Sequence, residues 1–224
     1  MILFLKDSGL RISDARQYNY GDIAEQLERG DDFISLTRIT EKQGTVAKTF
    51  SGSEAIEAIK TYIDARRKGS RRVPPEKITD KSPLFRTWTT KVSRILRTSF
   101  SSTIRYAFLQ INEPNITAHS LRKYLQTNLE AAGINTNWID QILGHKLINS
   151  RDAYSKPTDE QLYKAYAKAY KFIRIYPEVE IPTTQTPNTE PETSTSKEEY
   201  TTPTTTTYQH TVTVEGTQIF KKPK

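Results

Sequence analysis

The sequence predicts an α+β fold that is mostly helical and contains one small antiparallel β-hairpin. Three observations lead to this prediction. Apolar residues recur at helical spacing through most of the first 176 residues. Two short alternating segments flank a turn that contains glycine, and the elements follow the order helices, hairpin, helices. A chain of 224 residues is long enough for one domain with a sizeable core.

Charge and composition divide the chain into two parts. The whole chain has a net charge of +7, whereas residues 177–224 hold seven Glu and four Lys, so residues 1–176 carry +10. Residues 177–224 also contain 15 Thr and 6 Pro, and such a segment buries too little apolar surface to offset the entropy of ordering. We therefore expect a domain over 1–176 and a Thr/Pro/Glu-rich disordered tail over 177–224. A short strand or hairpin within 210–220 is the expected exception.

Several classes of protein and site are excluded or disfavoured. The chain has no cysteine, which excludes disulfides, thiolate catalysis and cysteine-based zinc or iron–sulfur sites. The longest apolar stretch, residues 1–5, is far too short to span a membrane and lacks the flanks of a signal peptide. We expect a cytoplasmic protein with no membrane partner.

The basic charge of residues 1–176 favours a polyanionic partner such as nucleic acid, and a solvated basic face without a ligand is the alternative. The most concentrated basic segment is RRKGSRR, residues 66–72. It predicts either a loop that contacts DNA phosphates or a plain solvated linker. Its candidate DNA-binding residues are Arg66, Arg67, Lys68, Arg71 and Arg72.

The first half of the domain is predicted to hold short helices, the hairpin and one longer helix. Residues 10–29 carry an imperfect apolar stripe that is broken at 19–21, which predicts two short helices with Ser8 as a candidate cap. Residues 33–39 and 46–50 alternate around a turn that contains Gly44. The segment 51–68 predicts a well-formed helix with Ser53 as its candidate cap.

The second half is predicted to hold four helices, with an irregular piece before the last one. One helix is expected from about Thr90 to Ile111, a second from about Ser120 to Gly133, and a third that ends at Gly144. The last helix covers 158–176, and the tyrosines at 163, 166 and 170 share one of its faces. This spacing is typical of a packing stripe.

Two arginines, two histidines and one tyrosine occur in patterned segments. They are Arg11 in SGLRISDA, His119 and Arg122 in HSLRKYL, and His145 and Tyr154 in LGHKLINSRDAY. His119 and Arg122 fall on one helical face. Cleavage of a phosphodiester without a metal needs an oxygen nucleophile, cations over the non-bridging oxygens and an acid for the leaving oxygen. The set holds a candidate for each need.

These segments, together with the hairpin and its lysine, resemble the catalytic domain of tyrosine recombinases, the integrase family of phages, archaeal viruses and Xer-type enzymes. The resemblance covers about residues 1–173. It implies the tyrosine recombinase catalytic-domain fold, the fold of DNA breaking–rejoining enzymes. It also implies site-specific DNA cleavage and rejoining, in integration or excision, through a 3′-phosphotyrosyl intermediate, with no metal and no cofactor.

The resemblance assigns roles to the residues that match the motifs. Arg11 and Arg122 would grip the scissile phosphate, and His145 would hydrogen-bond it. Tyr154 matches the nucleophile, and His119 would assist proton transfer.

The general acid is assigned to a lysine of the hairpin. Lys42 in the turn is the best match, and Lys48 on the second strand is the alternative. Either lysine would protonate the leaving 5′ oxygen.

The sequence departs from the family at its start, where only ten residues precede Arg11. We therefore expect the opening helix to be truncated and the N-terminal DNA-clamp domain to be absent. The expected partners are double-stranded DNA with an attachment-type site and other protomers in a synaptic tetramer, or a full-length integrase. Two alternatives stay open: a non-catalytic DNA-binding integrase remnant or regulator, and a type IB topoisomerase-like activity that relaxes DNA.

Overall fold

The computed structural model describes residues 1–146, 157–176, 213–214 and 217–218. The chain divides into two units, Met1–Val179 and Glu180–Lys224. In the second unit, β3 (Thr213–Val214) pairs antiparallel with β4 (Thr217–Gln218), which is the short hairpin predicted within 210–220. The rest of the predicted disordered tail lies outside the described residues, and all other described elements belong to the first unit.

The first unit opens with short helices. They are α1 (Ile2–Ser8), α2 (Ile12–Ala15), the 3₁₀ turn η1 (Tyr20–Asp22) and α3 (Ala24–Arg29). The two helices and the break predicted for 10–29 are confirmed, whereas the bounds of the helix before them, α1, were not predicted. Ser8 does not cap α2, because it ends α1 and its hydroxyl donates a hydrogen bond to Phe4 O at 2.6 Å.

The predicted hairpin is confirmed. Strands β1 (Ile34–Ile39) and β2 (Val46–Ser51) pair antiparallel, with Ile34 opposite Ser51, and Gly44 in the turn has φ 65°. Helix α4 (Ser53–Lys68) follows, and its N-cap is Gly52 instead of Ser53. A Cβ at position 52 would lie 2.2 Å from the Tyr170 ring, so the close approach of that ring requires glycine.

The predicted helix from about Thr90 to Ile111 starts later than expected, because α5 spans Arg97–Leu109. The residues before it form a turn in which Thr87 N donates to Ser93 O at 2.9 Å and Arg86 bridges to Arg94. The hydroxyls of Thr87 and Ser93 also bond each other at 2.7 Å. Serine and threonine side chains that bond locally compete with a helix, which explains the late start.

The remaining helices match their predictions. They are α6 (Ala118–Ala131), α7 (Thr136–Leu143) and α9 (Asp159–Ile173). The side chains of Thr117, Asn135 and Thr158 cap their N termini by accepting backbone N–H groups. Gly144 ends α7 in the left-handed conformation, as predicted.

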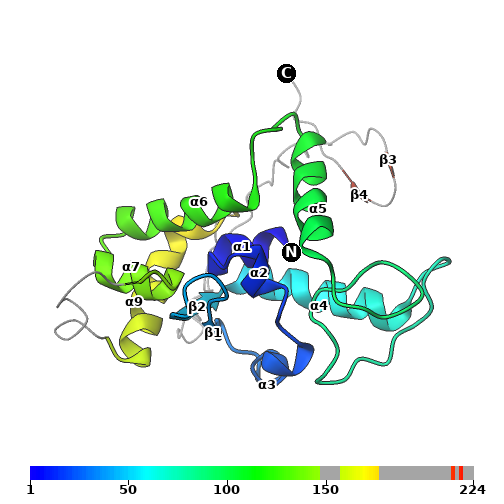
Figure 1. Ribbon diagram of the computed structural model, residues 1–224, viewed down its shortest axis with the longest axis horizontal. Helices are drawn as coiled ribbons and strands as arrows, with labels where there is room; N and C mark the ends of the chain where they lie inside the picture. The colour runs from blue at the N-terminus through cyan, green and yellow to red at the C-terminus, as the bar shows by residue number, and fades with distance from the viewer. Residues whose placement is uncertain (147–156, 177–212, 215–216, 219–224) are drawn as a thin grey trace, which may run out of the picture. The chain divides into compact units, whose positions relative to one another are not determined.

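Two apolar clusters form the core of this unit. One joins α1, α2, α4 and α5 with β1, and the other joins α6, α7 and α9 around Phe50 of β2. Figure 1 shows α6, α7 and α9 together on one side of α1 and the hairpin, with α5 on the other side. Both clusters include residues of the hairpin, whose turn carries Lys42. Leu10 and Arg11, which also line the site described below, lie in the turn between α1 and α2.

The tyrosine stripe on α9 is a packing stripe, as predicted, and its partners lie in the same chain. Phe33 makes edge contacts with Tyr163, Tyr166 and Tyr170 at centroid distances of 5.7, 5.8 and 5.1 Å. The hydroxyl of Tyr166 donates to Asp7 O at 2.8 Å.

A buried polar group fastens the end of α9 to α1 and α4. Lys6 Nζ donates to Glu54 Oε2 at 2.8 Å and to Ile173 O at 3.0 Å, and it contacts the Asp7 carboxylate. The other oxygen of Glu54 accepts the backbone N–H groups of Ile175 and Tyr176. These bonds hold both ends of the unit together.

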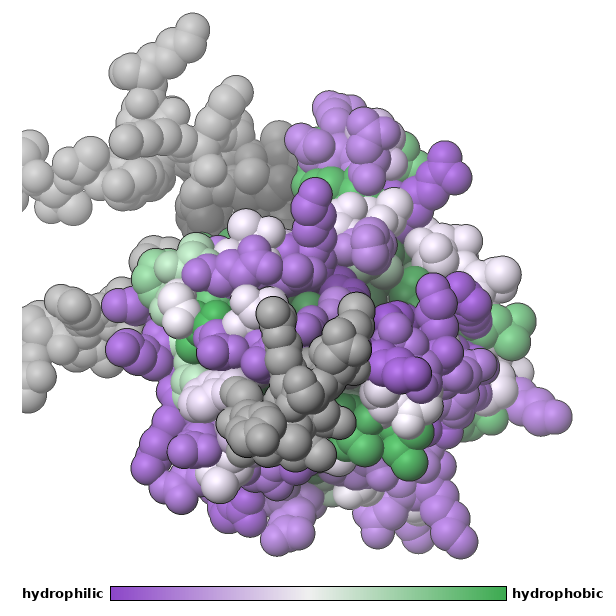
Figure 2. Space-filling view, turned by 60° about the vertical axis from the view of Figure 1, so that its left-hand side comes forward, coloured by the Kyte–Doolittle hydropathy of each residue, from purple (hydrophilic) through white to green (hydrophobic). Residues whose placement is uncertain are grey.

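The surface carries no long apolar segment among the described residues, and none of their helices is long and apolar enough to cross a membrane. Figure 2 shows mostly hydrophilic side chains on the face it presents, with small separate apolar patches between them. The exposed large apolar residues include Ile39, Trp88, Tyr106, Ile111 and Tyr176.

The structure contradicts the predicted DNA-binding role of Arg66. Its side chain is fully buried, and it forms a two-pronged ion pair with Glu76, whose other partner is the buried Arg86. Arg66 Nη1 also donates to the carbonyls of Pro83 and Leu84 at 3.0 Å. This arginine therefore holds the irregular segment after α4 in place and is not free to contact DNA.

We predict that Glu76→Ala lowers the free energy of unfolding by about 3–5 kcal/mol, because it leaves two buried guanidinium groups without a counter-charge. Burial by itself raises the pKa of Glu76, but its hydrogen bonds and ion pairs with Arg66 and Arg86 outweigh burial and lower this pKa below 4.5. The contribution of Glu76 is therefore complete above pH 4.5 and is lost as the pH falls through the lowered value.

Urea unfolding at neutral and acid pH measures both effects. Asp64→Ala is the matched control, because Asp64 pairs with Arg67 in an exposed ion pair that contributes about 0–1 kcal/mol. Equal losses from the two substitutions would contradict the prediction.

Candidate active site

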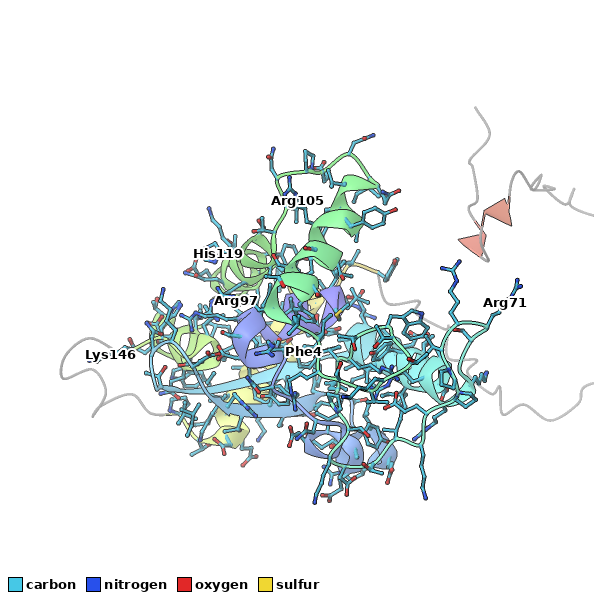
Figure 3. The ribbon with its side chains drawn as sticks, turned by 45° about the vertical axis from the view of Figure 1, so that its right-hand side comes forward. Phe4, Arg71, Arg97, Arg105, His119 and Lys146 are labelled. Carbon is cyan, nitrogen blue, oxygen red and sulfur yellow. The ribbon has the colours of Figure 1, made fainter. Side chains whose placement is uncertain are left out.

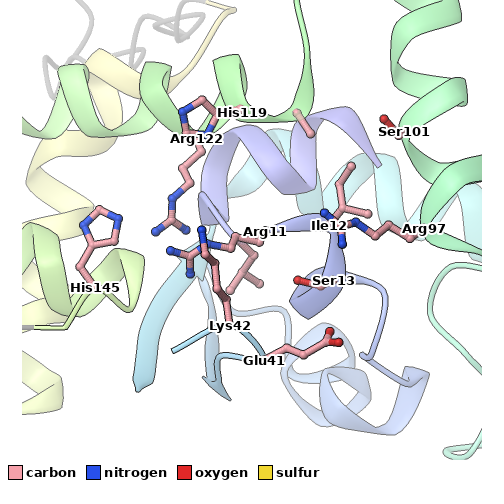
Figure 4. Close-up of a pocket in the computed structure, with 12 residues that line it drawn as sticks. Arg11, Ile12, Ser13, Glu41, Lys42, Arg97, Ser101, His119, Arg122 and His145 are labelled. Atoms are coloured by element: carbon pink, nitrogen blue, oxygen red, sulfur yellow. The ribbon is translucent and has the colours of Figure 1, made fainter. Parts of the chain in front are cut away.

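One pocket of about 700 Å³ brings together residues from five separate segments. Five of the six predicted catalytic residues line it: Arg11, Lys42, His119, Arg122 and His145. Figure 4 shows the charged ends of Arg11, Lys42 and Arg122 converging, with His145 to their left and His119 above them. The sixth residue, Tyr154, lies outside the described residues, nine residues after His145 and three before the buried Pro157.

Arg122 is the buried cation of the pocket. Its side chain extends from α6 and donates to Gly9 O at 2.6 Å and to Leu143 O at 2.7 Å. Burial, followed by the nearby charge of Arg11, lowers the pKa of Arg122 to about 10, so it stays protonated at neutral pH. No acidic side chain pairs with it among the described residues, which leaves its positive charge available to an anion.

Arg11 reaches the pocket from the turn between α1 and α2. Its Nη2 donates to Gln43 Oε1 at 3.3 Å, whereas its buried Nη1 has no hydrogen-bond partner in the described part of the chain. The turn depends on Gly9, which has φ 59° and where a Cβ would lie 2.7 Å from Leu125 Cδ2. Arg11 is therefore the second cation of the pocket, and its Nη1 is a hydrogen-bond donor that no other described residue uses.

The hairpin turn is tied to both sides of the pocket. Asp14, which is buried on α2, accepts a hydrogen bond from Glu41 N at 2.8 Å. The Thr45 hydroxyl donates to Gly144 O at 2.7 Å. These contacts place the turn that carries Lys42 between α2 and the end of α7.

The two lysines considered for the general acid occupy different places. Lys42 lines the pocket and is exposed. Lys48 instead forms an ion pair with Asp159 of α9 at 2.5 Å and does not line the pocket. The geometry favours Lys42.

The two histidines are held differently. His119 is exposed in the first turn of α6, three residues before Arg122. His145 follows α7, and its Nδ1 lies 2.9 Å from Asp140 Oδ1. This contact engages Nδ1, so Nε2 is the ring nitrogen left to interact with a ligand.

Sequence reasoning missed Asp14, Asp140, Arg97 and Ser101. Asp140 lies five residues before His145 across a helix-ending glycine, a spacing that could have suggested the contact. Asp14 and the start of α5 carry no such local signal, because their partners are distant in the sequence.

The basic segment 66–72 does not line this pocket. Arg67 is half exposed and pairs with Asp64, while Lys68, Arg71 and Arg72 are exposed. Without Arg66, this segment still offers exposed cations, and its contact with DNA stays a prediction.

Comparison with known proteins identifies relatives for most of this chain. The model of the family described as "Phage integrase family" matches residues 1–161. Tyrosine recombinase XerC from Pelobacter propionicus is 28% identical over 171 residues, and XerC from Pelotomaculum thermopropionicum is 27% identical over 163 residues. These alignments cover 76% and 72% of this chain but 51% and 50% of the relatives, so the chain spans about half their length.

Solved structures resemble the same region. The crystal structure of XerA recombinase matches with a TM-score of 0.50 and 21% identity, over 73% of this chain and 53% of the other. The integrase from mycobacterium phage Brujita matches with a TM-score of 0.49 and 19% identity, over 75% of this chain and 50% of the other. The XerA likeness supports the predicted catalytic-domain fold.

We predict that Gly144→Ala destabilises the protein by about 2–4 kcal/mol. The residue has φ +65°, which is unfavourable for alanine, and the new Cβ would lie 2.7 Å from both Ala47 Cβ and Thr40 Cγ2. Gly133→Ala is the matched control, because Gly133 has φ +76° with nothing within 4 Å of the new Cβ. Gly133→Ala should cost only about 1–2 kcal/mol in the same urea titration, the cost of the left-handed conformation alone. An equal cost at both positions would show that the contact with the hairpin is unimportant.

Proposed function

Because the chain belongs to the phage integrase family, we propose that residues 1–176 form a catalytic domain that cleaves and rejoins DNA at specific sites through Tyr154. The observation that carries the proposal is the convergence of Arg11, Lys42 and Arg122 in one pocket with two histidines. Four basic residues and one acidic residue line this pocket. Such a site suits the charge that gathers on a phosphodiester during cleavage.

In the proposed cleavage step, Tyr154 Oη attacks the scissile phosphorus and the bond from phosphorus to the 5′ oxygen breaks. The phenol proton leaves toward His119, and the Lys42 ammonium donates a proton to the departing 5′ oxygen. The product is a 3′-phosphotyrosyl bond and a free 5′-hydroxyl. Attack of a 5′-hydroxyl on this bond reverses the step and rejoins the strand.

The two arginines and His145 hold the non-bridging oxygens. A guanidinium group forms charge-assisted hydrogen bonds with phosphate oxygens, and these bonds strengthen as negative charge accumulates. Arg122 uses two N–H groups to bind carbonyls, which fixes its position and leaves its other N–H groups for phosphate. When His145 Nδ1 donates to Asp140, Nε2 can donate to a phosphate oxygen once the ring is protonated at both nitrogens.

Electrostatics support double-stranded DNA as the partner. Acidic residues, all exposed except the half-buried Asp31, gather on α3, on α4 and just before β1, namely Glu25, Glu28, Asp31, Asp32, Glu57 and Asp64. The pocket, in contrast, includes the single acidic residue Glu41 among the described residues that line it. We propose that DNA approaches the face that carries the pocket, with further protomers of the same protein completing a synaptic assembly.

We predict that the wild-type protein forms a covalent adduct with nicked DNA and that Tyr154→Phe does not, because phenylalanine lacks the attacking oxygen. The substrate is a library of nicked duplexes with randomised sequence near the nick, from which the short cleaved strand dissociates so that the adduct accumulates. Denaturing gels detect the adduct, and sequencing of the captured DNA defines the preferred site.

Tyr163→Phe is the control for loss of a tyrosine hydroxyl, since Tyr163 packs against Phe33 on α9. It should retain the adduct. An adduct that persists in Tyr154→Phe would reject Tyr154 as the nucleophile. Captured DNA without any shared sequence would reject site specificity and favour a topoisomerase-like activity.

We predict that Lys42→Ala slows cleavage by about 10²–10⁴-fold through loss of the general acid. A substrate with sulfur in place of the 5′ bridging oxygen should restore the rate, because a thiolate leaves without protonation. Single-turnover cleavage of both substrates measures this. Lys48→Ala is the control, because it removes only the exposed ion pair with Asp159, and it should cleave the oxygen substrate at close to the wild-type rate. If the sulfur substrate instead rescues Lys48→Ala and not Lys42→Ala, the general acid is Lys48.

A further inference from the structure

The pocket extends beyond the groups that the proposed cleavage step uses. Its other end is lined by Arg97 and Ser101 of α5 and by Ser13 of α2. In Figure 4, Arg97 lies apart from the converging Arg11, Lys42 and Arg122, on the side of Ile12 and Ser13. The pocket, of about 700 Å³, therefore continues past the three converging cations to a fourth basic residue, Arg97, on another element.

The three polar side chains at this end have no partner in the described part of the chain. Arg97 forms no ion pair or hydrogen bond there, and neither do the hydroxyls of Ser13 and Ser101. Arg97 and Ser101 are exposed and lie one helical turn apart, so they face the same side of α5. Their donors are free to bind a ligand.

Arg97 is also placed where it does not stabilise its own helix. It is the first residue of α5, and a cation near a helix N terminus is unfavourable because the backbone N–H groups there already carry positive partial charge. The first turn of α5 contains no acidic residue that would compensate. Binding of an anion would remove this repulsion.

We propose that Arg97, Ser13 and Ser101 form a second phosphate subsite, which holds a DNA backbone phosphate next to the scissile one. The proposal rests on the proposed function, which places the scissile phosphate among Arg11, Lys42 and Arg122. Successive phosphates of one strand are separated by about 3.4 Å of rise along the duplex axis, so a strand in the pocket presents more than one. Arg97 is then a positioning residue that sets the register of the strand.

The first test uses binding alone and any short duplex. Arg97→Ala should lower the magnitude of the slope of log affinity against log salt concentration by about 0.9, because one phosphate contact is lost. Arg97→Lys keeps the charge and should keep the slope. Lys164→Ala, which removes a cation paired with Glu160 on α9, is the control and should leave the slope unchanged.

The second test locates the phosphate on the captured site. Duplexes carry a neutral methylphosphonate at one position at a time around the scissile phosphate, and Tyr154→Phe protein prevents cleavage while binding is measured. In the Tyr154→Phe protein, a methylphosphonate at one position next to the scissile phosphate should weaken binding about tenfold. In the double variant Tyr154→Phe, Arg97→Ala, the same methylphosphonate should not weaken binding further. Arg105→Ala is the matched control, because Arg105 is an exposed arginine of the same helix that does not line the pocket (Figure 3).

Arg105→Ala should retain the position-specific effect, whatever it does to overall affinity. The subsite is rejected if Arg97→Ala leaves the salt slope unchanged, or if it keeps the full response to every neighbouring methylphosphonate. The salt slope is measured by binding alone and needs no cleavage. A protein that forms no covalent adduct would therefore reject the proposed function, and the slope would still test the role of Arg97. Circular dichroism of each variant establishes that the exposed substitution leaves the fold intact.

Discussion

The pocket depends on the two hydrogen bonds that Arg122 donates to the carbonyls of Gly9 and Leu143. These bonds join the ends of α1 and α7 to α6, and so they set the positions of Arg11 and His145, which follow those ends directly. A buried guanidinium would be costly without polar partners, and here carbonyl dipoles supply them in place of a carboxylate. The guanidinium of Arg122 is thereby fixed in position while its positive charge stays available, and a site that binds an anion requires both.

Elements with strong local signals could be predicted from the sequence. The hairpin followed from its alternation and from Gly44, and α6, α7 and α9 followed from apolar spacing with capping residues and glycines at their ends. The start of α5 could not be predicted, because hydroxyl groups of residues 87–93 bond within a turn and override the helical pattern. The burial of Arg66 could not be predicted either, because its partner Glu76 lies beside it only once the loop between them has folded.

The site shows the same division between local and long-range information. Motifs around Arg11, His119, Arg122 and His145 predicted the residues that line the pocket, and the position of Tyr154 relative to them stays a prediction. The supporting contacts could not be predicted, because Asp14 and Glu41 or Thr45 and Gly144 meet only after α2, the hairpin and α7 have packed together. Arg97 belongs to no motif, and it becomes informative only through the pocket that it lines.

The contacts between α1 and α9 also bear on how the protein folds as it is synthesised. Tyr166 binds the carbonyl of Asp7, and Lys6 binds the carbonyl of Ile173, across sequence separations of 159 and 167 residues. Contacts between such distant residues form late, because a long stretch of chain must be ordered to close them. On the ribosome, Lys6 can pair with Asp7 and Glu54 before α9 has emerged, but its bond to Ile173 and the bond from Tyr166 to Asp7 cannot form. A nascent chain shorter than about residue 173 therefore cannot complete this core.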